Sequence, residues 1–200
     1  MPGGEPSGAE PRGGLTGSTP RSVAEPSELA LVRAQEDLRT QLRDAVEVER
    51  AVRQALKFAA GLLRADGWCV AVLEPGEPQA AVMLGGIHPP TGGWPTDELA
   101  RFIRGERVEL ASSLAVGRLR RRRRAWGALV LHWDGGGVGW GLRTSLTKLA
   151  AVCNEALERI EARRLSHVRG RLDRKIMEQL RPKDLLYHIL DGLRSLTGYD

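Results

Sequence analysis

The pattern of hydrophobic positions predicts a small β-sheet flanked by long helices. Residues Ser113–Leu119 alternate loosely between apolar and polar, and residues Ala125–Trp133 are almost wholly apolar. A short apolar run bounded by turn residues is typical of a strand buried on both faces. Five consecutive arginines, Arg120–Arg124, separate the two runs and fit the turn of a hairpin. We therefore expect this hairpin at the centre of a single sheet.

A second hairpin and a short helix are predicted on its N-terminal side. Strands over Trp68–Leu73 and Gln79–Leu84 are separated by Pro75-Gly76-Glu77-Pro78, a sequence typical of a turn. Thr96 can then cap a helix over Asp97–Arg104, which begins with two acidic residues, as the positive end of a helix favours.

A long helix is predicted to open at Ser27, a good N-cap residue. Alternating steps of four and three give a narrow apolar seam, broken only by Gln35 and Glu49, and such a seam favours a partner helix. A helix lying on its own domain would show a wider stripe, and the stripe does widen from Val52. We therefore predict a coiled-coil helix over 27–51 and a helix docked on the sheet after it. The seam residues are Leu31, Leu38, Leu42, Ala45, Val52, Leu56, Ala59 and Leu63.

Leu142–Leu180 is predicted to be a second long helix. Its first half has a broad apolar face suited to packing on the sheet, and its second half keeps only a narrow stripe: Leu165, Val168, Leu172, Ile176 and Leu180. Three successive steps of four depart from a heptad, so a coil formed there would be locally unwound. Pro182 interrupts the pattern, and another amphipathic helix follows over Asp184–Leu196.

The end of the chain repeats an earlier pattern. LLRADGWCVAVL and LRSLTGYD both run from an amphipathic helix through a glycine turn to an aromatic residue, and the second copy stops where a strand would begin. We therefore expect 182–200 to be the start of a second, truncated domain, after a domain over 52–162 and a linker helix over 163–181.

Composition adds limits to this picture. The chain has 200 residues, a hydrophobic fraction of 42% and a net charge of +5, much of it in the arginine run. The two cysteines, Cys69 and Cys153, lie far apart in apolar settings and indicate buried thiols in a reducing compartment. Residues 1–26, rich in Gly, Pro, Ser and Glu, indicate a disordered tail without a signal sequence. With no apolar run that could span a bilayer, we expect a cytoplasmic protein.

The central hairpin resembles a known family. Ser113–Leu119 (SLAVGRL) and Trp126–Leu131 (WGALVL) are similar to the stretch of the GAF domain family that reads SLLAVPLR, a turn, and then a Gly-apolar-Leu strand. Leu196–Asp200 (LTGYD) looks like the start of a second such domain. The resemblance covers roughly Val52 to Ile160 and the final residues.

This resemblance implies an α+β fold: an antiparallel GAF-like sheet with helices packed on one face, flanked by long N- and C-terminal coiled-coil helices. It also implies a possible small-molecule pocket on the other face, dimers joined through the terminal helices, and tandem sensor domains ahead of an output enzyme. The chain departs from the ligand-binding members. It lacks the NKFDE-type set of the cyclic-nucleotide binders, Cys69 is not where a bilin-attaching cysteine is expected, and no histidine cluster suggests haem or metal. No cofactor is therefore predicted, and any ligand is unknown.

Two groups of residues are candidates for binding. Trp94, Trp126 and His132 could contact a ligand, since Trp126 and His132 share one strand face by the period of two; ordinary core packing is the alternative. Arg118 and Arg120, Arg121, Arg122, Arg123 and Arg124 could bind phosphates or an anionic surface; a solvated hairpin turn is the alternative, and it is favoured because no aromatic platform accompanies the arginines.

Three classes of function follow. The favoured one is a sensory or regulatory GAF-type module that dimerises through its flanking helices and relays a signal to a C-terminal output domain. The alternative is a protein that binds nucleic acid or an anionic surface through the Arg118–Arg124 turn, although nucleic acid is not the favoured partner. An enzyme is not predicted, because no nucleophile with a base, no paired carboxylates and no metal set is visible. The expected homodimer interface consists of Leu31, Leu38, Leu42, Val52, Leu165, Val168, Leu172 and Ile176.

Overall fold

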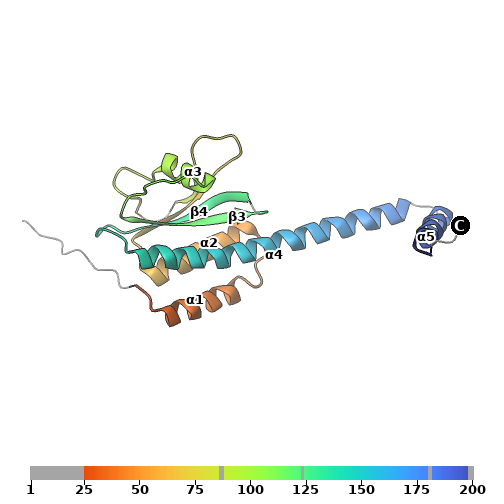
Figure 1. Ribbon diagram of the computed structural model, residues 1–200, viewed down its shortest axis with the longest axis horizontal. Coiled ribbons are helices and arrows are strands. Elements are labelled where there is room, and N and C mark those ends of the chain that lie inside the picture. Colours follow the sequence, from red (N-terminus) through yellow and green to blue (C-terminus); the bar gives the residue numbers. More distant parts are fainter. Residues whose placement is uncertain (1–24, 86–87, 123, 180–181, 198–200) are drawn as a thin grey trace, which may run out of the picture.

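The computed structural model describes residues 25–85, 88–122, 124–179 and 182–197. They form an α+β fold in which a sheet is covered by helices on both faces, and one helix projects far beyond the sheet, with the last helix past its end (Figure 1). The elements are α1 (Glu28–Gln41), α2 (Val48–Leu63), β1 (Gly67–Val72), β2 (Ala81–Gly85), α3 (Thr96–Arg104), β3 (Leu114–Arg121), β4 (Arg124–His132), α4 (Trp140–Gln179) and α5 (Pro182–Thr197).

The sheet has four antiparallel strands in the order β2-β1-β4-β3. Strand β4 lies inside the sheet and pairs with both β1 and β3, which explains why its sequence is apolar on both faces. The predicted antiparallel sheet and its central hairpin are thus confirmed, with the hairpin turn at the arginine run.

The two faces of the sheet build two separate cores. Leu129 and Leu131 of β4 belong to a large core shared with α1, α2 and α4. Ala128 and Val130, which alternate with them, belong to a smaller core under α3. The helices from both ends of the chain therefore cover one face, as predicted, while the short helix α3 covers the other.

The end of α2 is fixed by a backbone conformation and by a hydrogen bond. Arg64 adopts the left-handed conformation that ends many helices. The indole Nε1 of the buried Trp133 donates a hydrogen bond of 3.3 Å to the carbonyl oxygen of Leu63, one of the carbonyls that the helix itself leaves unpaired. Trp133 follows β4 directly, so this bond joins the central strand to the helix beneath it.

The expected N-terminal coiled-coil helix over 27–51 is wrong. The chain forms two helices, because α1 ends at Gln41 and α2 begins only at Val48. A straight helix could bury one stripe against the domain, whereas the break lets α1 pack on α4 and α2 pack under the sheet. The added burial of apolar surface favours the broken form. The seam residues Leu31, Leu38 and Leu42 are accordingly buried within this chain.

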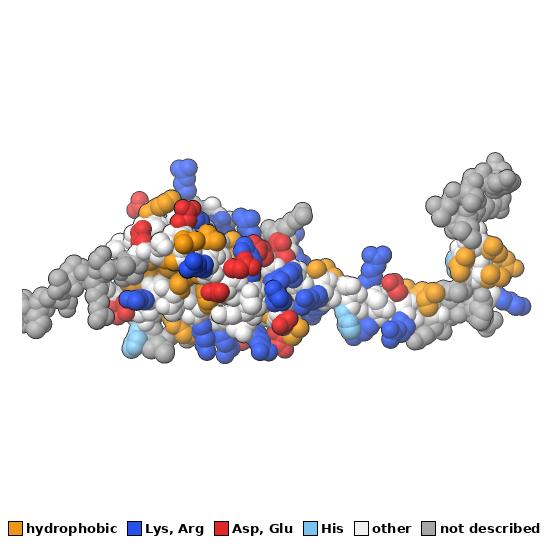
Figure 2. Space-filling view, turned by 90° about the horizontal axis from the view of Figure 1, so that it is seen from below, with side chains coloured by type: hydrophobic (Ala, Val, Ile, Leu, Met, Phe, Trp, Pro, Cys, Tyr) orange, Lys and Arg blue, Asp and Glu red, His pale blue; other side chains and the backbone are white. Residues whose placement is uncertain are grey.

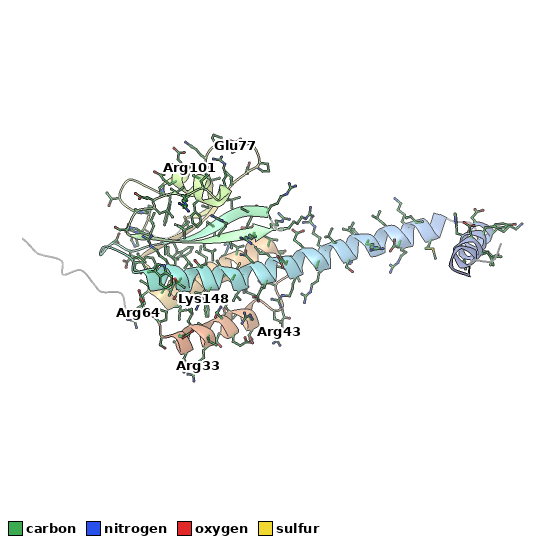
Figure 3. The ribbon with its side chains drawn as sticks, viewed as in Figure 1. Arg33, Arg43, Arg64, Glu77, Arg101 and Lys148 are labelled. Carbon is green, nitrogen blue, oxygen red and sulfur yellow. The ribbon has the colours of Figure 1, made fainter. Side chains whose placement is uncertain are left out.

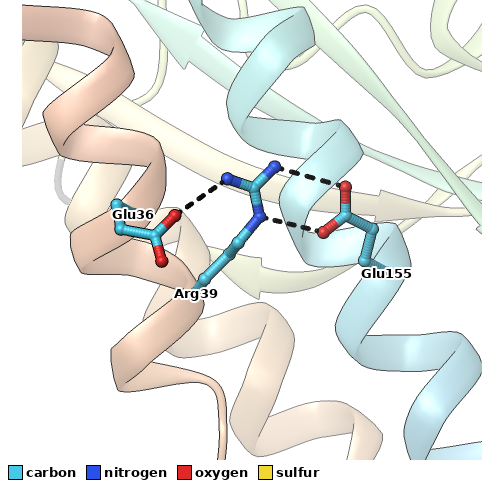
Figure 4. A network of polar contacts seen from close by, with 3 residues as sticks. All are labelled: Glu36, Arg39 and Glu155. Atoms are coloured by element: carbon cyan, nitrogen blue, oxygen red, sulfur yellow. Dashed lines mark hydrogen bonds and ion pairs between the residues drawn. The ribbon is translucent and has the colours of Figure 1, made fainter.

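A polar contact also fastens α1 to α4. The guanidinium of Arg39 donates to the Glu155 carboxylate, with Nε 3.1 Å from Oε2, and to Glu36 at 3.2 Å (Figure 4). All three side chains are largely exposed, so this network contributes little stability beside the buried leucines.

The predicted domain organisation is only partly covered by the described residues. The predicted disordered tail lies outside them except for Glu25 and Pro26, and the carboxylate of Glu25 accepts a hydrogen bond of 3.0 Å from the N–H of Gly141. Residues 182–197 form helix α5, close to the predicted bounds. That this helix starts a second domain stays a prediction.

Replacing Gly127 by alanine should destabilise the sheet. A Cβ at Gly127 would lie 2.6 Å from the carbonyl oxygen of Ala71 on the neighbouring strand, a backbone atom that cannot turn away. We expect a loss of about 1–3 kcal/mol in the free energy of unfolding, measured by urea denaturation. Gly61→Ala, in a helix with open space around it, is the control and should be neutral or stabilising by about 0.5–1 kcal/mol. Equal effects of the two substitutions would show that the close approach of the Ala71 carbonyl does not exclude a side chain at Gly127.

Leu38→Ala should destabilise the folded chain and leave its oligomeric state unchanged. Leu38 of α1 is fully buried in the main core of the same chain. Its truncation therefore leaves a cavity that costs about 2–5 kcal/mol in the free energy of unfolding. Chemical denaturation gives the stability, and sedimentation velocity gives the subunit count. Dissociation of a dimer at unchanged stability would instead support a coiled coil formed by α1 with a second chain.

Candidate functional site

The face of the sheet under α3 carries the polar residues that could meet a ligand. His132, at the end of β4, is 4% exposed, and its Nδ1 lies 3.6 Å from Oδ1 of Asp134. That distance is too long for a hydrogen bond, and among the described residues Nδ1 has no other partner. The ring of Trp94 stands edge-on to the imidazole, with 6.5 Å between the ring centroids. Trp94 and His132 are therefore brought together, as the sequence suggested.

Trp126 does not join them. Leu119 of β3 faces Gly127, but the next residue, Arg120, faces Ala125, so Trp126 is an extra residue in β4. Such a bulge reverses the alternation of side chains, and Trp126 packs on the opposite core with α2 and α4. The prediction that Trp126 and His132 share one face is wrong for this reason.

Apolar side chains fill the space between α3 and the sheet. Leu99, Ala100 and Ile103 of α3 are completely buried against Cys69 and Val130. Two open hollows, of about 560 and 530 Å³, instead lie along the outer edge of β3, and Phe102, Val116 and Thr147 line both of them. A ligand under α3 would thus require these side chains to move.

The arginines of the central turn have different environments. The guanidinium of Arg118 lies 4.7 Å from the ring centroid of Phe102, and its Nη2 donates to the Phe102 carbonyl oxygen at 2.6 Å. Arg121 and Arg122 bind a carboxylate on α4. Arg120 and Arg124 are exposed, and Arg123 lies outside the described residues. The turn is therefore not one free cationic patch, and its role in anion binding stays a prediction.

Arg121 and Arg122 bind the carboxylate of Glu161, which is 5% exposed. Arg121 Nε lies 2.6 Å from Oε1, and Arg122 Nε lies 3.3 Å from Oε2. Burial by itself would raise the pKa of Glu161, but the hydrogen bond and charge of Arg121, with the charge of Arg122, hold the pKa below its ordinary value of 4.5. We call this contact the clasp. It joins the tip of the hairpin to α4 at the last turn before α4 leaves the body, by which we mean the described residues up to 162.

Both cysteines are buried thiols, as predicted. Cys69 lies on β1 under α3, and Cys153 lies on α4 in the other core. Burial raises the pKa of each thiol to about 12. At neutral pH neither side chain carries the thiolate that reacts with oxidants or metals.

Metal binding and membrane insertion find no support in the described residues. In the part of the chain that the structure describes, no three His, Cys, Asp or Glu side chains gather in a way that could hold a metal ion. None of the described helices combines the length and the apolar character needed to cross a lipid bilayer.

The helix α4 continues beyond the body as what we call the tail, residues 163–179 (Figure 1). Leu165, Val168, Leu172 and Ile176 are 54, 37, 55 and 54% exposed, and they lie three or four residues apart on the tail. The predicted interface residues are thus divided. The N-terminal ones and Val52 are buried inside the chain, whereas these four form an exposed apolar stripe.

Comparisons of the sequence with protein-family models and with curated proteins give no match. Comparison with solved structures does. The GAF domain of a phosphoenolpyruvate-protein phosphotransferase from Coxiella burnetii matches 69% of this chain and 98% of its own, with a TM-score of 0.50 at 8% identity. The free methionine-R-sulfoxide reductase from Neisseria meningitidis, solved with its substrate, matches 70% and 95%, with a TM-score of 0.51 at 11% identity.

A bacteriophytochrome from the photosynthetic bacterium R. palustris matches 74% of this chain and 42% of its own, with a TM-score of 0.50 at 15% identity. These likenesses show that the chain has a GAF-like fold, as the sequence resemblance indicated. They do not extend to a common ligand or activity.

Removing the charge of Glu161 should destabilise the fold in a pH-dependent way. We expect Glu161→Gln to cost about 1–3 kcal/mol in the free energy of unfolding at neutral pH, because two guanidinium groups lose their anion. The pKa of Glu161 is lower in the folded chain, so its contribution is complete above pH 4.5 and is lost as the pH falls through the folded-state pKa.

Urea denaturation at neutral and acidic pH measures this difference. Glu106→Gln is the matched control, since Glu106 pairs with Arg101 at the surface and should matter by less than about 1 kcal/mol. A Glu161→Gln effect that persists at acidic pH would show that the charge is not its cause.

Proposed function

We propose that this chain is a cytoplasmic regulatory module of the GAF type, which forms a homodimer through its tail and relays a conformational signal along α4 to an output domain. The observation that carries the proposal is α4 itself. Its first half forms part of the main core, and its second half exposes an apolar stripe that no described residue of the chain covers. One rigid helix therefore belongs both to the domain and to the surface that can act on a partner.

The strands supply a route from the α3 face to this helix. Arg118 and His132 lie on β3 and β4 under α3, and the same two strands end in the hairpin tip whose arginines bind Glu161. A ligand that moved α3 would also act on β3 and β4, the strands that hold α4 where it leaves the body. Such a two-state element can transmit a signal.

The exposed stripe supports self-association. Leaving four large aliphatic side chains in water is unfavourable, and burying one of them fully contributes about 1.5–3 kcal/mol. In a symmetric dimer each of these positions contributes two buried side chains, one from each copy. Since α1 already packs on its own chain, the tail is the part of the predicted interface that remains available for a second copy.

The known structures with this fold support a module within a longer protein. In the R. palustris bacteriophytochrome the matched part is 42% of the chain, so the fold occurs there joined to other regions. For this chain, neither the signal nor the output is assigned, and no catalytic role is proposed.

Leu165→Asp combined with Leu172→Asp should convert a dimer into a folded monomer. The control is Leu29→Asp combined with Val32→Asp, which places the same charges on exposed apolar positions of α1. We expect the wild-type chain and the control to be dimeric at micromolar concentration in high-salt buffer, by sedimentation equilibrium. A monomeric wild-type chain, or loss of the dimer in the control alone, would overturn the proposed interface.

A further inference from the structure

Positive charge is concentrated in the hairpin tip and in the C-terminal part of α4. Residues 118–124 and 159–179 together hold 13 Arg and Lys against 3 Asp and Glu, a net charge of +10. The rest of the chain holds 17 basic and 22 acidic residues, a net charge of −5. The clasp places the two segments side by side, and Figure 2 shows basic side chains where the body meets the tail.

The basic residues border the apolar stripe. Arg164 lies four residues before Val168, and Arg171 and Lys175 lie three and seven residues after it, which puts all three along one side of the stripe. Arg169 is four residues from Leu165 and three from Leu172, on the other side. All four cations are exposed. We call these two rows the rims.

Pairing two tails brings their rims together. Helices that bury such a stripe approach to about 8–10 Å, which is about one Debye length at physiological salt, so repulsion between the rims is only partly screened. In an antiparallel pair the row of Arg164, Arg171 and Lys175 faces its own copy. A parallel pair would place both hairpins between the two tails, since the hairpin stands on the stripe side of α4, and the antiparallel pair is therefore favoured. Charge opposes the contact that the apolar stripe favours.

We infer that a multivalent phosphate-bearing anion promotes the pairing of two tails by binding between their rims. This inference rests on the proposed homodimer and adds its regulation. Guanidinium groups bind phosphate oxygens through two parallel hydrogen bonds, and three of the four rim cations are arginines. An anion of several charges neutralises both tails at once, which single chloride ions do less effectively.

The position of the stripe favours a small soluble anion over a surface. The stripe continues, in the same steps of three and four, the row Asn154, Leu157 and Glu161, which faces the β3–β4 hairpin. Figure 1 shows the hairpin on one side of α4, and the helical spacing places the stripe on this same side. A flat bilayer would meet the hairpin before the stripe, whereas a small anion enters the space between two paired tails.

Sedimentation equilibrium of the full chain tests the inference with sodium tripolyphosphate against sodium chloride at equal ionic strength. We expect tripolyphosphate to lower the dissociation constant of the dimer about tenfold or more, close to 1.4 kcal/mol per factor of ten. Two further arms use vesicles containing phosphatidylserine and a short duplex DNA. Pairing promoted by either of these but not by tripolyphosphate would overturn a small soluble anion as the partner, and equal pairing in the two salts would overturn the inference.

Charge reversal on one rim supplies the second test. Arg171→Glu combined with Lys175→Glu should pair without tripolyphosphate and lose the response to it, because each rim then offers carboxylates to the cations of the other copy. Arg33→Glu combined with Arg43→Glu makes the same change of charge on exposed positions of α1 and the turn after it, which Figure 3 shows away from the sheet, and should keep the response. Equal loss of the response in both variants would show that net charge alone, and not the rims, controls pairing.

The two levels of the proposal can fail separately. If the wild-type chain stays monomeric in every buffer, the homodimer itself is overturned. If it forms a dimer that the Leu165 and Leu172 substitutions dissolve but tripolyphosphate leaves unchanged, the homodimer stands and its regulation by an anion is overturned.

Discussion

The close packing of α4 against the β3–β4 hairpin is the constraint on which the rest of the structure depends. A Cβ at Gly117 would lie 2.8 Å from Cβ of Ala150 and 3.0 Å from the Leu146 carbonyl oxygen, so helix and strand touch along their backbones. Asn154 bridges them further, accepting from the N–H of Arg120 at 2.8 Å and donating to the carbonyl oxygen of Arg118 at 3.1 Å. These bonds cover part of the exposed edge of β3, which protects it from pairing with other chains.

This packing also explains how one helix serves two environments. Up to Glu161 the helix face turned toward the hairpin is satisfied by strand atoms and arginines; beyond it the same face meets water. The body therefore determines the direction and the rotation of the tail. The hairpin is joined to α4 just before the tail begins, because Glu161 is held on both of its oxygens.

Local patterns in the sequence were enough to predict the sheet and most helix bounds. The apolar run of β4 and the arginine turn marked the central hairpin, and glycine and proline marked the ends of several elements. The break between α1 and α2 was not predictable in this way, because Leu31, Leu38 and Leu42 have the same spacing whether they face a second chain or α4. Periodicity reports that a face is buried and leaves open what buries it.

The site was predicted less well for related reasons. A single bulge at Trp126 moved one of three candidate residues to the other face, and its signal in the sequence is Gly127, a glycine inside the strand. The clasp was missed because Arg121 and Glu161 are 40 residues apart, and only the packing of α4 on the hairpin brings them together. His132 and Trp94 lie beside each other, with their ring centroids 6.5 Å apart, and their role in binding a ligand stays a prediction.

The burial of both cysteines has a practical consequence for studying the protein. With thiol pKa values near 12 and both sulfurs buried, Cys69 and Cys153 should react slowly with maleimides at neutral pH. A single cysteine introduced on the tail would then carry a spin label or fluorophore selectively, without removal of the native residues. Because the two native thiols lie in the cores on either side of the sheet, a label attached to the surface would report only the introduced position.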